Sequence, residues 1–181
     1  MKKESDRPFF TIWLTGLPCS GKTTIAKALI KKLNDDLSLN RGRRFISLDG
    51  DDLRSKLNSD LGFSPEDREE NLRRVGHLAQ LFNEKEVNVV CSFVSPNDEL
   101  RETATQHIDN VFLVFVDCSA KTCAERDVKG MWAKAKAGEI KMFTGYSAPF
   151  DAPKEPDLKL NTETLNLEEC VNQIIQALTG S

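Results

Sequence analysis

The sequence predicts an α/β fold in which helices cover both faces of one parallel β-sheet. Four apolar segments have the composition of strands, 9–15, 43–49, 87–93 and 111–117, and 157–161 is a weaker fifth. These segments are almost continuously hydrophobic, which indicates strands buried on both faces. Helical patterns lie between them, and such alternation is typical of a parallel sheet wrapped by helices.

Length and composition suit a single domain, which we assign to the whole chain, residues 1–181. The hydrophobic content of 39% allows a sizeable core, while the net charge of −3 and the scattered basic residues argue against a nucleic-acid partner. The longest strongly apolar run, 111–116, is too short to cross a membrane. The five cysteines show neither zinc-site spacing nor a disulfide framework, so we expect reduced thiols and a cytoplasmic protein.

The first strand is followed by the loop 16–23, which reads Gly-Leu-Pro-Cys-Ser-Gly-Lys-Thr and fits the phosphate-binding pattern GxxxxGK[ST]. Glycine lets the backbone approach phosphates closely, and the following helix N-terminus supplies positive potential. Lys22 should reach the β- and γ-phosphates, and the Thr23 hydroxyl should serve Mg²⁺. The expected ATP-binding residues here are Gly16, Leu17, Pro18, Cys19, Ser20, Gly21, Lys22, Thr23 and Thr24.

The second strand ends in Asp49-Gly50-Asp51. Strand periodicity predicts that both carboxylates lie on one side of the carboxyl edge, where open α/β sheets bind ligands. We expect Asp51 to orient and deprotonate an attacking hydroxyl, and Asp49 to help hold the metal; either carboxylate could serve Mg²⁺ together with Thr23. In the alternative interpretation, this turn only caps the next helix through Asp52.

Three helices follow from apolar periodicity and end signals. The helix that begins near Ser64 has that residue as N-cap, Pro65 at its first position and Asp67 to complete a capping box. The loop 138–156 holds three prolines and two glycines, which predicts an irregular and often functional segment. The expected buried stripes are Ile25, Leu29 and Leu33; Leu72, Val75, Ala79 and Phe82; and Leu167, Val171, Ile174 and Leu178.

A phosphate-binding loop leaves the reaction open among a regulatory GTPase, a nucleic-acid motor and a small-molecule kinase. The chain contains no NKxD sequence for guanine, and its DxxG match, 127–130, falls within an expected helix rather than just after a strand. Motors usually need a longer chain than this one. These observations favour a kinase.

Six motifs in order, "GLPCSGKTT", "LDGDDLR", "LGFSPEDREENLRR", "SFVSP", "ERDVKG" and "GEIKMFTG", resemble the adenylyl-sulfate kinase family over residues 10–162. The resemblance implies transfer of the ATP γ-phosphate, with Mg²⁺, to the 3′-hydroxyl of adenosine 5′-phosphosulfate, a step of sulfate assimilation. It also implies a three-layer P-loop kinase fold with a five-stranded parallel sheet and a mobile lid at about 126–150. A homodimer is compatible with this interpretation.

The resemblance assigns the acceptor to Arg54, Arg68 and Asn71, and guanidinium groups do suit oxyanions. It matches Phe63 and Phe143 to the aromatic rings that sandwich the acceptor's adenine. Without the family, Phe63 reads as a core residue. Asp49, Phe93, Val94, Ser95 and Lys129 complete the expected acceptor site.

Ser95 aligns with a serine that is either phosphorylated as an intermediate or only positions the reactants, and we favour direct transfer; a serine before Pro96 is also a common turn former. In the lid, Arg126 is expected to contact the donor nucleotide, and Lys129 the acceptor or the developing negative charge. A solvated helix face is the alternative for 126–130. Trp132 is expected to pack the lid or touch nucleotide.

Departures from the family pattern leave two further hypotheses. Pro18 and Cys19 replace small polar residues in the phosphate loop, and Asn-Asp-Glu at 97–99 stands where the family often has aromatic and basic residues. A related kinase acting on another nucleotide anhydride or phosphoramidate is therefore the second candidate, and an ATP-dependent interaction domain without transfer is the third. His77 and His107 have no obvious partner.

Overall fold

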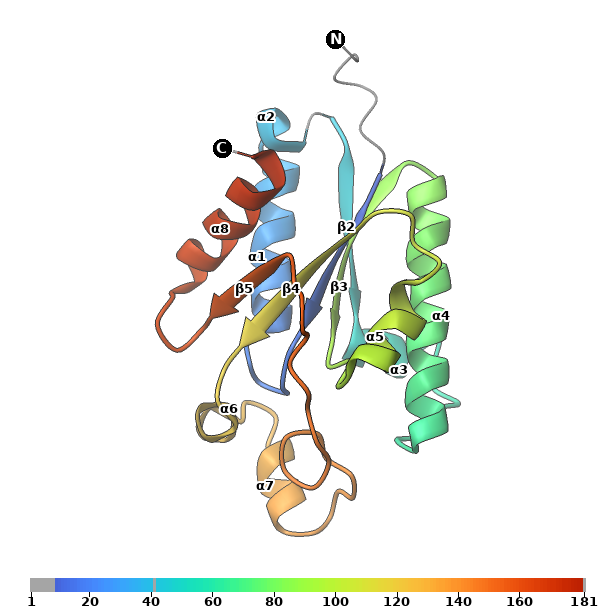
Figure 1. The fold of residues 1–181 in the computed structure, drawn as a ribbon, viewed down its shortest axis with the longest axis vertical. Helices are drawn as coiled ribbons and strands as arrows, with labels where there is room; N and C mark the ends of the chain where they lie inside the picture. Colours follow the sequence, from blue (N-terminus) through green and yellow to red (C-terminus); the bar gives the residue numbers. More distant parts are fainter. Residues whose placement is uncertain (1–8, 41, 181) are drawn as a thin grey trace.

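The computed structural model describes residues 9–40 and 42–180 and shows a five-stranded, all-parallel sheet between two layers of helices (Figure 1). The sheet order is β2-β3-β1-β4-β5. All five predicted strands are confirmed, including the weaker fifth, and so is the fold class. The strands are β1 (Thr11–Thr15), β2 (Arg44–Asp49), β3 (Val87–Phe93), β4 (Val111–Asp117) and β5 (Leu158–Asn161).

Helices α1 and α8 cover one face of the sheet, and α4 with α5 covers the other, while α6 and α7 lie beyond the carboxyl ends of the strands (Figure 1). No helix among residues 9–40 and 42–180 is long and apolar enough to cross a membrane. The helices are α1 (Lys22–Asp35), α2 (Leu37–Asn40), α3 (Gly50–Arg54), α4 (Pro65–Glu84), α5 (Asp98–Thr105), α6 (Ala120–Arg126), α7 (Met131–Lys136) and α8 (Leu167–Thr179).

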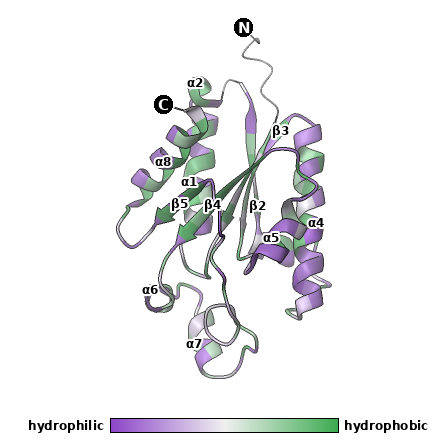
Figure 2. Cartoon of the chain, viewed as in Figure 1, coloured by the Kyte–Doolittle hydropathy of each residue, from purple (hydrophilic) through white to green (hydrophobic). Residues whose placement is uncertain are grey.

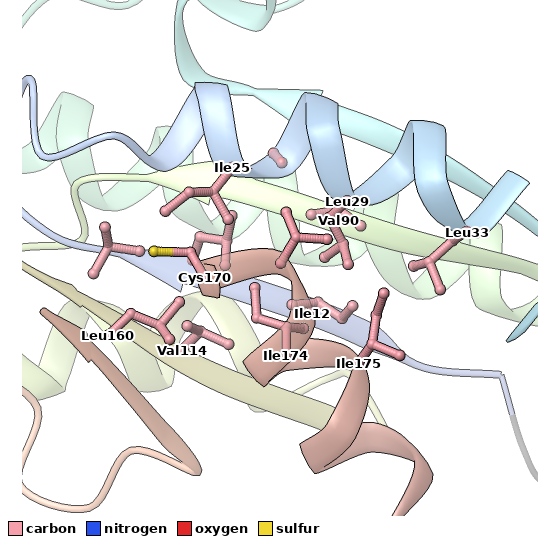
Figure 3. Packing of buried hydrophobic residues seen from close by; sticks show 14 of the residues in the cluster. Ile12, Ile25, Leu29, Leu33, Val90, Val114, Leu160, Cys170, Ile174 and Ile175 are labelled. Atoms are coloured by element: carbon pink, nitrogen blue, oxygen red, sulfur yellow. The ribbon is translucent and has the colours of Figure 1, made fainter. Parts of the chain in front are cut away.

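The core consists of one apolar layer on each face of the sheet. Beneath α1 and α8, side chains of the central strands meet both helices (Figure 3). Figure 2 shows β4 and β5 as hydrophobic and much of α4 as hydrophilic, as expected for a sheet buried between amphipathic helices. The buried residues of the first layer include Ile12, Val90, Val114 and Leu160 of the sheet, Ile25, Leu29 and Leu33 of α1, and Ile174 and Ile175 of α8.

The predicted helical stripes hold with one exception. Ile25, Leu29 and Leu33 are buried, as are Leu72, Val75 and Ala79, with Phe82 and Leu178 partly buried. Leu167 is 42% exposed, because it is the first residue of α8 and the packed face of that helix begins only at Cys170.

The start of α4 matches the prediction in part. The Ser64 hydroxyl accepts a hydrogen bond from Asp67 N at 3.1 Å, and Pro65 is the first helical residue. The Asp67 carboxylate, however, accepts from Gly62 N at 3.0 Å instead of from Ser64 N. A capping box normally uses the longer glutamate or glutamine at this position, and α8 has one, with Asn166 and Glu169.

Residues 127–130 are not helical, and that prediction is wrong. They form the turn between α6 and α7, where Gly130 adopts a φ of +66° that favours glycine. The Asp127 carboxylate accepts hydrogen bonds from Trp132 N at 3.0 Å and Ala133 N at 2.9 Å. Asp127 therefore closes the first turn of α7. The loop 138–156 is irregular, as predicted.

Candidate active site

The loop 16–23 leaves the middle of the sheet, because β1 pairs with β3 on one side and β4 on the other. A Cβ atom at Gly16 would lie only 2.4 Å from the carbonyl oxygen of Val116, so no other residue fits where the loop crosses β4. Lys22 Nζ donates to Gly16 O at 2.9 Å and to Leu17 O at 2.7 Å. Lys22, at the end of the loop, is thus hydrogen-bonded to the two residues at its start.

Lys22 is only 8% exposed. Burial lowers its pKa to about 8, although neighbouring groups, including Asp49 and Asp51, act in the opposite direction. An ammonium with so little water around it gains strongly from a nearby anion, and a phosphate group would supply one. This is the property expected of a phosphate-binding lysine.

Asp49 lies at the centre of a hydrogen-bond cluster at the end of β2. Its Oδ2 accepts from Thr23 Oγ1 at 2.7 Å and from Ser92 Oγ at 2.6 Å, and its Oδ1 accepts from Asp51 N at 3.0 Å. Burial alone would raise the pKa of this carboxyl, but these hydrogen bonds lower it, so Asp49 is ionised. Ser92 was not predicted; it contacts Asp49 because β2 and β3 pair these two residues.

Strand periodicity predicted that Asp49 and Asp51 lie on one strand face, and this prediction is wrong. The strand ends at Asp49, and α3 begins at Gly50. Asp49, and not Asp52, is the N-cap of α3. Asp51 lies in the first turn of α3 with an exposed side chain, and it forms an ion pair with Lys129 from the turn between α6 and α7. The hydrogen bond from this pairing raises the pKa of Lys129.

The guanidinium groups of Arg54, in α3, and Arg68, in α4, both contact Phe63. Arg54 Nη1 donates to Gly62 O at 2.6 Å, and its guanidinium lies 4.5 Å from the centre of the Phe63 ring. Arg68 Nε donates to Phe63 O at 3.0 Å. Burial lowers the pKa of Arg68, and the positive charge of Arg54 adds to this shift. A pair of close, half-buried cations is a favourable site for an anion.

Arg68 also joins the two predicted adenine-binding segments. It donates to Thr144 Oγ1 at 2.8 Å and to Met142 O, on either side of Phe143, while it holds the carbonyl of Phe63. Phe63 is 54% exposed, so its interpretation as a core residue is wrong. Phe143 is buried against Trp132, with ring centres 5.1 Å apart.

The segment 93–95 is tied to β1. Ser95 Oγ donates to Thr15 Oγ1 at 2.8 Å and accepts from Trp13 Nε1 at 3.2 Å, and the residue is 2% exposed. Val94 O accepts from Thr15 Oγ1 at 2.9 Å. Phe93 stacks on Trp13 with ring centres 5.4 Å apart. These contacts fix the segment 93–95 to the end of β1, from which the loop 16–23 begins.

Arg101 was missed by sequence reasoning. It is 4% exposed, and its guanidinium donates to Ser95 O at 2.7 Å and to Asp151 O at 2.8 Å. It thus fixes the end of the loop 138–156 to the segment after β3. Its ion pair with Asp98, at 2.8 Å, is local but has the same i,i+3 spacing as the exposed pair of Glu70 and Arg73. The contact that distinguishes Arg101 is with Asp151 O, 50 residues away, so no local pattern could have indicated it.

The remaining predicted residues border the loop 16–23. Arg126 donates to Thr162 O at 2.6 Å, and Thr162 Oγ1 donates to Ser20 O at 2.9 Å. Trp132 Nε1 donates to Pro18 O at 3.2 Å, which packs α7 onto the loop. A cavity of about 500 Å³ opens here, lined by Leu17, Ala120 and residues 145–150.

His77 and His107 are away from this region and stack on each other, with ring centres 4.5 Å apart, which the sequence did not indicate.

A five-stranded parallel sheet with a phosphate loop after its central strand, an ionised carboxylate beside the loop and an arginine pair opposite defines a P-loop kinase. Residues 8–161 match the family model for adenylylsulphate kinase. The chain belongs to this family, and it is accordingly an enzyme that transfers phosphate to a hydroxyl group.

Similar proteins agree with this assignment. The adenylyl-sulfate kinase of Bacteroides fragilis is 46% identical over 167 residues, which cover 91% of this chain and 80% of the relative. That of Bacillus licheniformis is 47% identical over 91% of this chain and 82% of its own length. The solved structure of the APS kinase of Mycobacterium tuberculosis, in complex with AMPPNP and APS, superposes with a TM-score of 0.87 at 41% identity and covers 96% of this chain and 99% of that one.

Proposed function

We propose that this protein catalyses the reaction of its family, transferring the γ-phosphate of ATP to the 3′-hydroxyl of adenosine 5′-phosphosulfate. The observation that carries this proposal is the position of Asp51. Asp51 N donates to Asp49 Oδ1 at 3.0 Å, and Asp49 Oδ2 accepts from Thr23 of the phosphate loop at 2.7 Å. Arg54 follows Asp51 by three residues in the same helix, α3. Asp51 therefore lies within electrostatic reach of the phosphate loop on one side and of the arginine pair on the other.

The donor site is the loop 16–23 with Thr24 and Arg126. Backbone N–H groups and Lys22 bind the β- and γ-phosphates of ATP. Thr23 Oγ1 and Asp49 Oδ2, 2.7 Å apart, are oxygen ligands of the kind that Mg²⁺ prefers, and they would hold it. When bound, Mg²⁺ neutralises charge on the phosphate oxygens. The described residues contain no cluster of three or more His, Cys, Asp or Glu that could hold a metal ion.

The acceptor site is the region around Arg54, Arg68 and Asn71. The two guanidinium groups bind the oxyanions of the phosphosulfate, and the exposed ring of Phe63 stacks on the adenine. Phe143 is buried against Trp132, so its contact with the adenine requires the loop 138–156 to move. Asp51 accepts the proton of the 3′-hydroxyl as the hydroxyl oxygen attacks the γ-phosphorus. The bond from the γ-phosphorus to the bridging oxygen breaks, and ADP leaves with that oxygen.

We propose that residues 126–150 form a lid over both substrates. Lys129 leaves Asp51 when the substrates bind and donates instead to the transferring phosphoryl group. Closure excludes water, which limits ATP hydrolysis. Transfer is direct, since the hydroxyl of Ser95 is buried and bonded to Thr15 and Trp13; Ser95 supports the site rather than carrying phosphate.

An acceptor panel tests the proposed function. The protein is incubated with Mg²⁺, γ-labelled ATP and each of several nucleotides: adenosine 5′-phosphosulfate, adenosine 5′-phosphoramidate, AMP and ADP. We expect label in the 3′-position of the phosphosulfate and at most weak transfer elsewhere. Preferred transfer to the phosphoramidate would support the second hypothesis instead, and binding of ATP without transfer to any acceptor would support the non-transferring domain.

We further propose that residues 1–181 act as one catalytic domain in the cytoplasm, where thiols stay reduced; all five cysteines are unpaired. We also propose a homodimer. Light scattering after size-exclusion chromatography measures the molar mass, and a value near the 20.3 kDa of one chain would refute the dimer.

A further inference from the structure

Asn58 is a buried polar residue between the two segments that carry the acceptor-binding groups. It follows α3, which holds Asp51 and Arg54, and precedes α4, which holds Arg68 and Asn71. Its side chain is fully buried, with an exposed fraction of 0%. Its backbone N–H donates to Leu53 O at 2.8 Å, which anchors it to the end of α3.

The Asn58 side chain has one hydrogen bond, and that bond goes to the acceptor site. Its Nδ2 donates to Asn71 Oδ1 at 2.9 Å, while its own Oδ1 has no partner in the described part of the chain. A buried amide oxygen without a hydrogen-bond partner is unfavourable. Among the described residues, the one side-chain hydrogen bond of Asn58 is thus to Asn71.

In the structure, this contact occupies the oxygen end of the Asn71 amide. With Oδ1 held by Asn58, Asn71 presents Nδ2, a donor group, and not the oxygen. Asn71 lies one helical turn after Arg68, so the two side chains share a face of α4. A donor at this position suits an oxyanion, whereas the reversed amide would direct an oxygen at it.

We propose that Asn58 is a positioning residue for the acceptor, holding the Asn71 amide so that Nδ2 donates to an oxygen of the phosphosulfate. This inference rests on the proposed function. Asn58 contacts neither substrate and acts only through Asn71.

The test compares Asn58→Asp, Asn58→Ser and Asn71→Ala with wild type. An ionised carboxylate in place of the Asn58 amide can only accept a hydrogen bond, so the Asn71 amide must turn over to reach it. At pH 8 we expect Asn58→Asp to raise the KM for adenosine 5′-phosphosulfate about tenfold, the effect of one lost hydrogen bond, with kcat and the KM for ATP within about twofold of wild type. As the pH falls, the protonated carboxyl regains a donor, so the KM should return toward that of wild type.

A buried asparagine away from the site provides the matched control. Asn40 donates to Leu33 O at 2.7 Å and accepts from Gly42 N at 2.7 Å. Asn40→Ala should lower the melting temperature without changing the KM for the acceptor. Asn58→Ser, which is too short to reach Asn71, should raise this KM as well, and the double variant Asn58→Ser/Asn71→Ala should match Asn71→Ala alone.

The outcomes separate this inference from the proposed function. If wild type does not phosphorylate adenosine 5′-phosphosulfate, the proposed function fails and the inference fails with it. If wild type is active but folded Asn58→Asp has an unchanged KM at every pH, only the role of Asn58 is refuted. Additive effects in the double variant would refute it too, because Asn58 would then act by a route other than Asn71.

Discussion

Lys129 and Asp51 form an ion pair between the turn after α6 and the first turn of α3, although 78 residues separate them. In this pair, each side chain neutralises a charge that the proposed reaction needs. Exposed ion pairs contribute only about 0–1 kcal/mol, so substrates can replace this one easily. The pair also holds the segment 127–130 near the site.

We expect Lys129→Ala to separate catalysis from stability. If Lys129 moves to the transferring phosphoryl group, its loss should lower kcat by roughly 10²–10³-fold, the usual effect of one transition-state donor. The melting temperature should change little, because the pair is exposed. Lys134→Ala, which removes an exposed lysine of α7, is the control. A Lys129→Ala enzyme with the kcat of wild type would show that the pair has no catalytic part.

Lys22 should destabilise the free enzyme. Its pKa is about 8 in the folded protein, below the ordinary 10.5 that the unfolded chain approaches. Between these values the unfolded chain binds more protons, so stability rises with pH; below pH 8 the full cost of the buried charge, up to about 3 kcal/mol, is present. Lys22→Met should abolish phosphoryl transfer while unfolding with at least the wild-type free energy at pH 7.

Urea unfolding of both proteins at pH 7, 8, 9 and 10 measures this difference. The gap between Lys22→Met and wild type should shrink as the pH rises from 8 toward 10. A variant that is less stable than wild type at every pH would mean that the bonds of Lys22 to Gly16 O and Leu17 O outweigh the cost of its burial.

Arg68→Ala should weaken acceptor binding far more than ATP binding. Hydrogen bonds to charged groups contribute about 1.5–3 kcal/mol, which corresponds to roughly 10–100-fold in affinity. Calorimetry with adenosine 5′-phosphosulfate measures the loss. Arg73→Ala is the matched control, because Arg73 is on the same helix but pairs with Glu70 in the exposed surface. Equal acceptor affinity in Arg68→Ala and wild type would refute the assignment.

Gly76 marks the closest approach of α4 to α5. A glycine inside a helix is ordinarily less stable than alanine by about 1 kcal/mol. Here a Cβ atom would lie 2.1 Å from Ala104 O, so Gly76→Ala requires the two helices to separate. We expect a loss of about 1–3 kcal/mol in unfolding free energy, measured by urea denaturation. Gln80→Ala, one turn further along α4, should change it by less than about 0.5 kcal/mol.

The sequence alone predicted the five strands, the phosphate loop and the N-cap of α4, because each depends on residues within a few positions of one another. The prediction from strand periodicity was wrong at Asp49 and Asp51, because the strand ends before the second aspartate and a helix begins there. The helix expected at 127–130 is a turn, since Asp127 and Gly130 end α6 and begin α7.

Tertiary structure alone decided how the site is assembled. The pairing of Lys129 with Asp51, the burial of Arg101 and the contact of Asn58 with Asn71 join residues that no local pattern relates. It also showed which of two phenylalanines is exposed, Phe63, and which is covered, Phe143. The physical reason is the sequence separation of the interacting residues. Hydrogen bonds and apolar periodicity within one segment depend on residues close together in the sequence. Burial and ion pairing depend on which distant segments the packed sheet brings together.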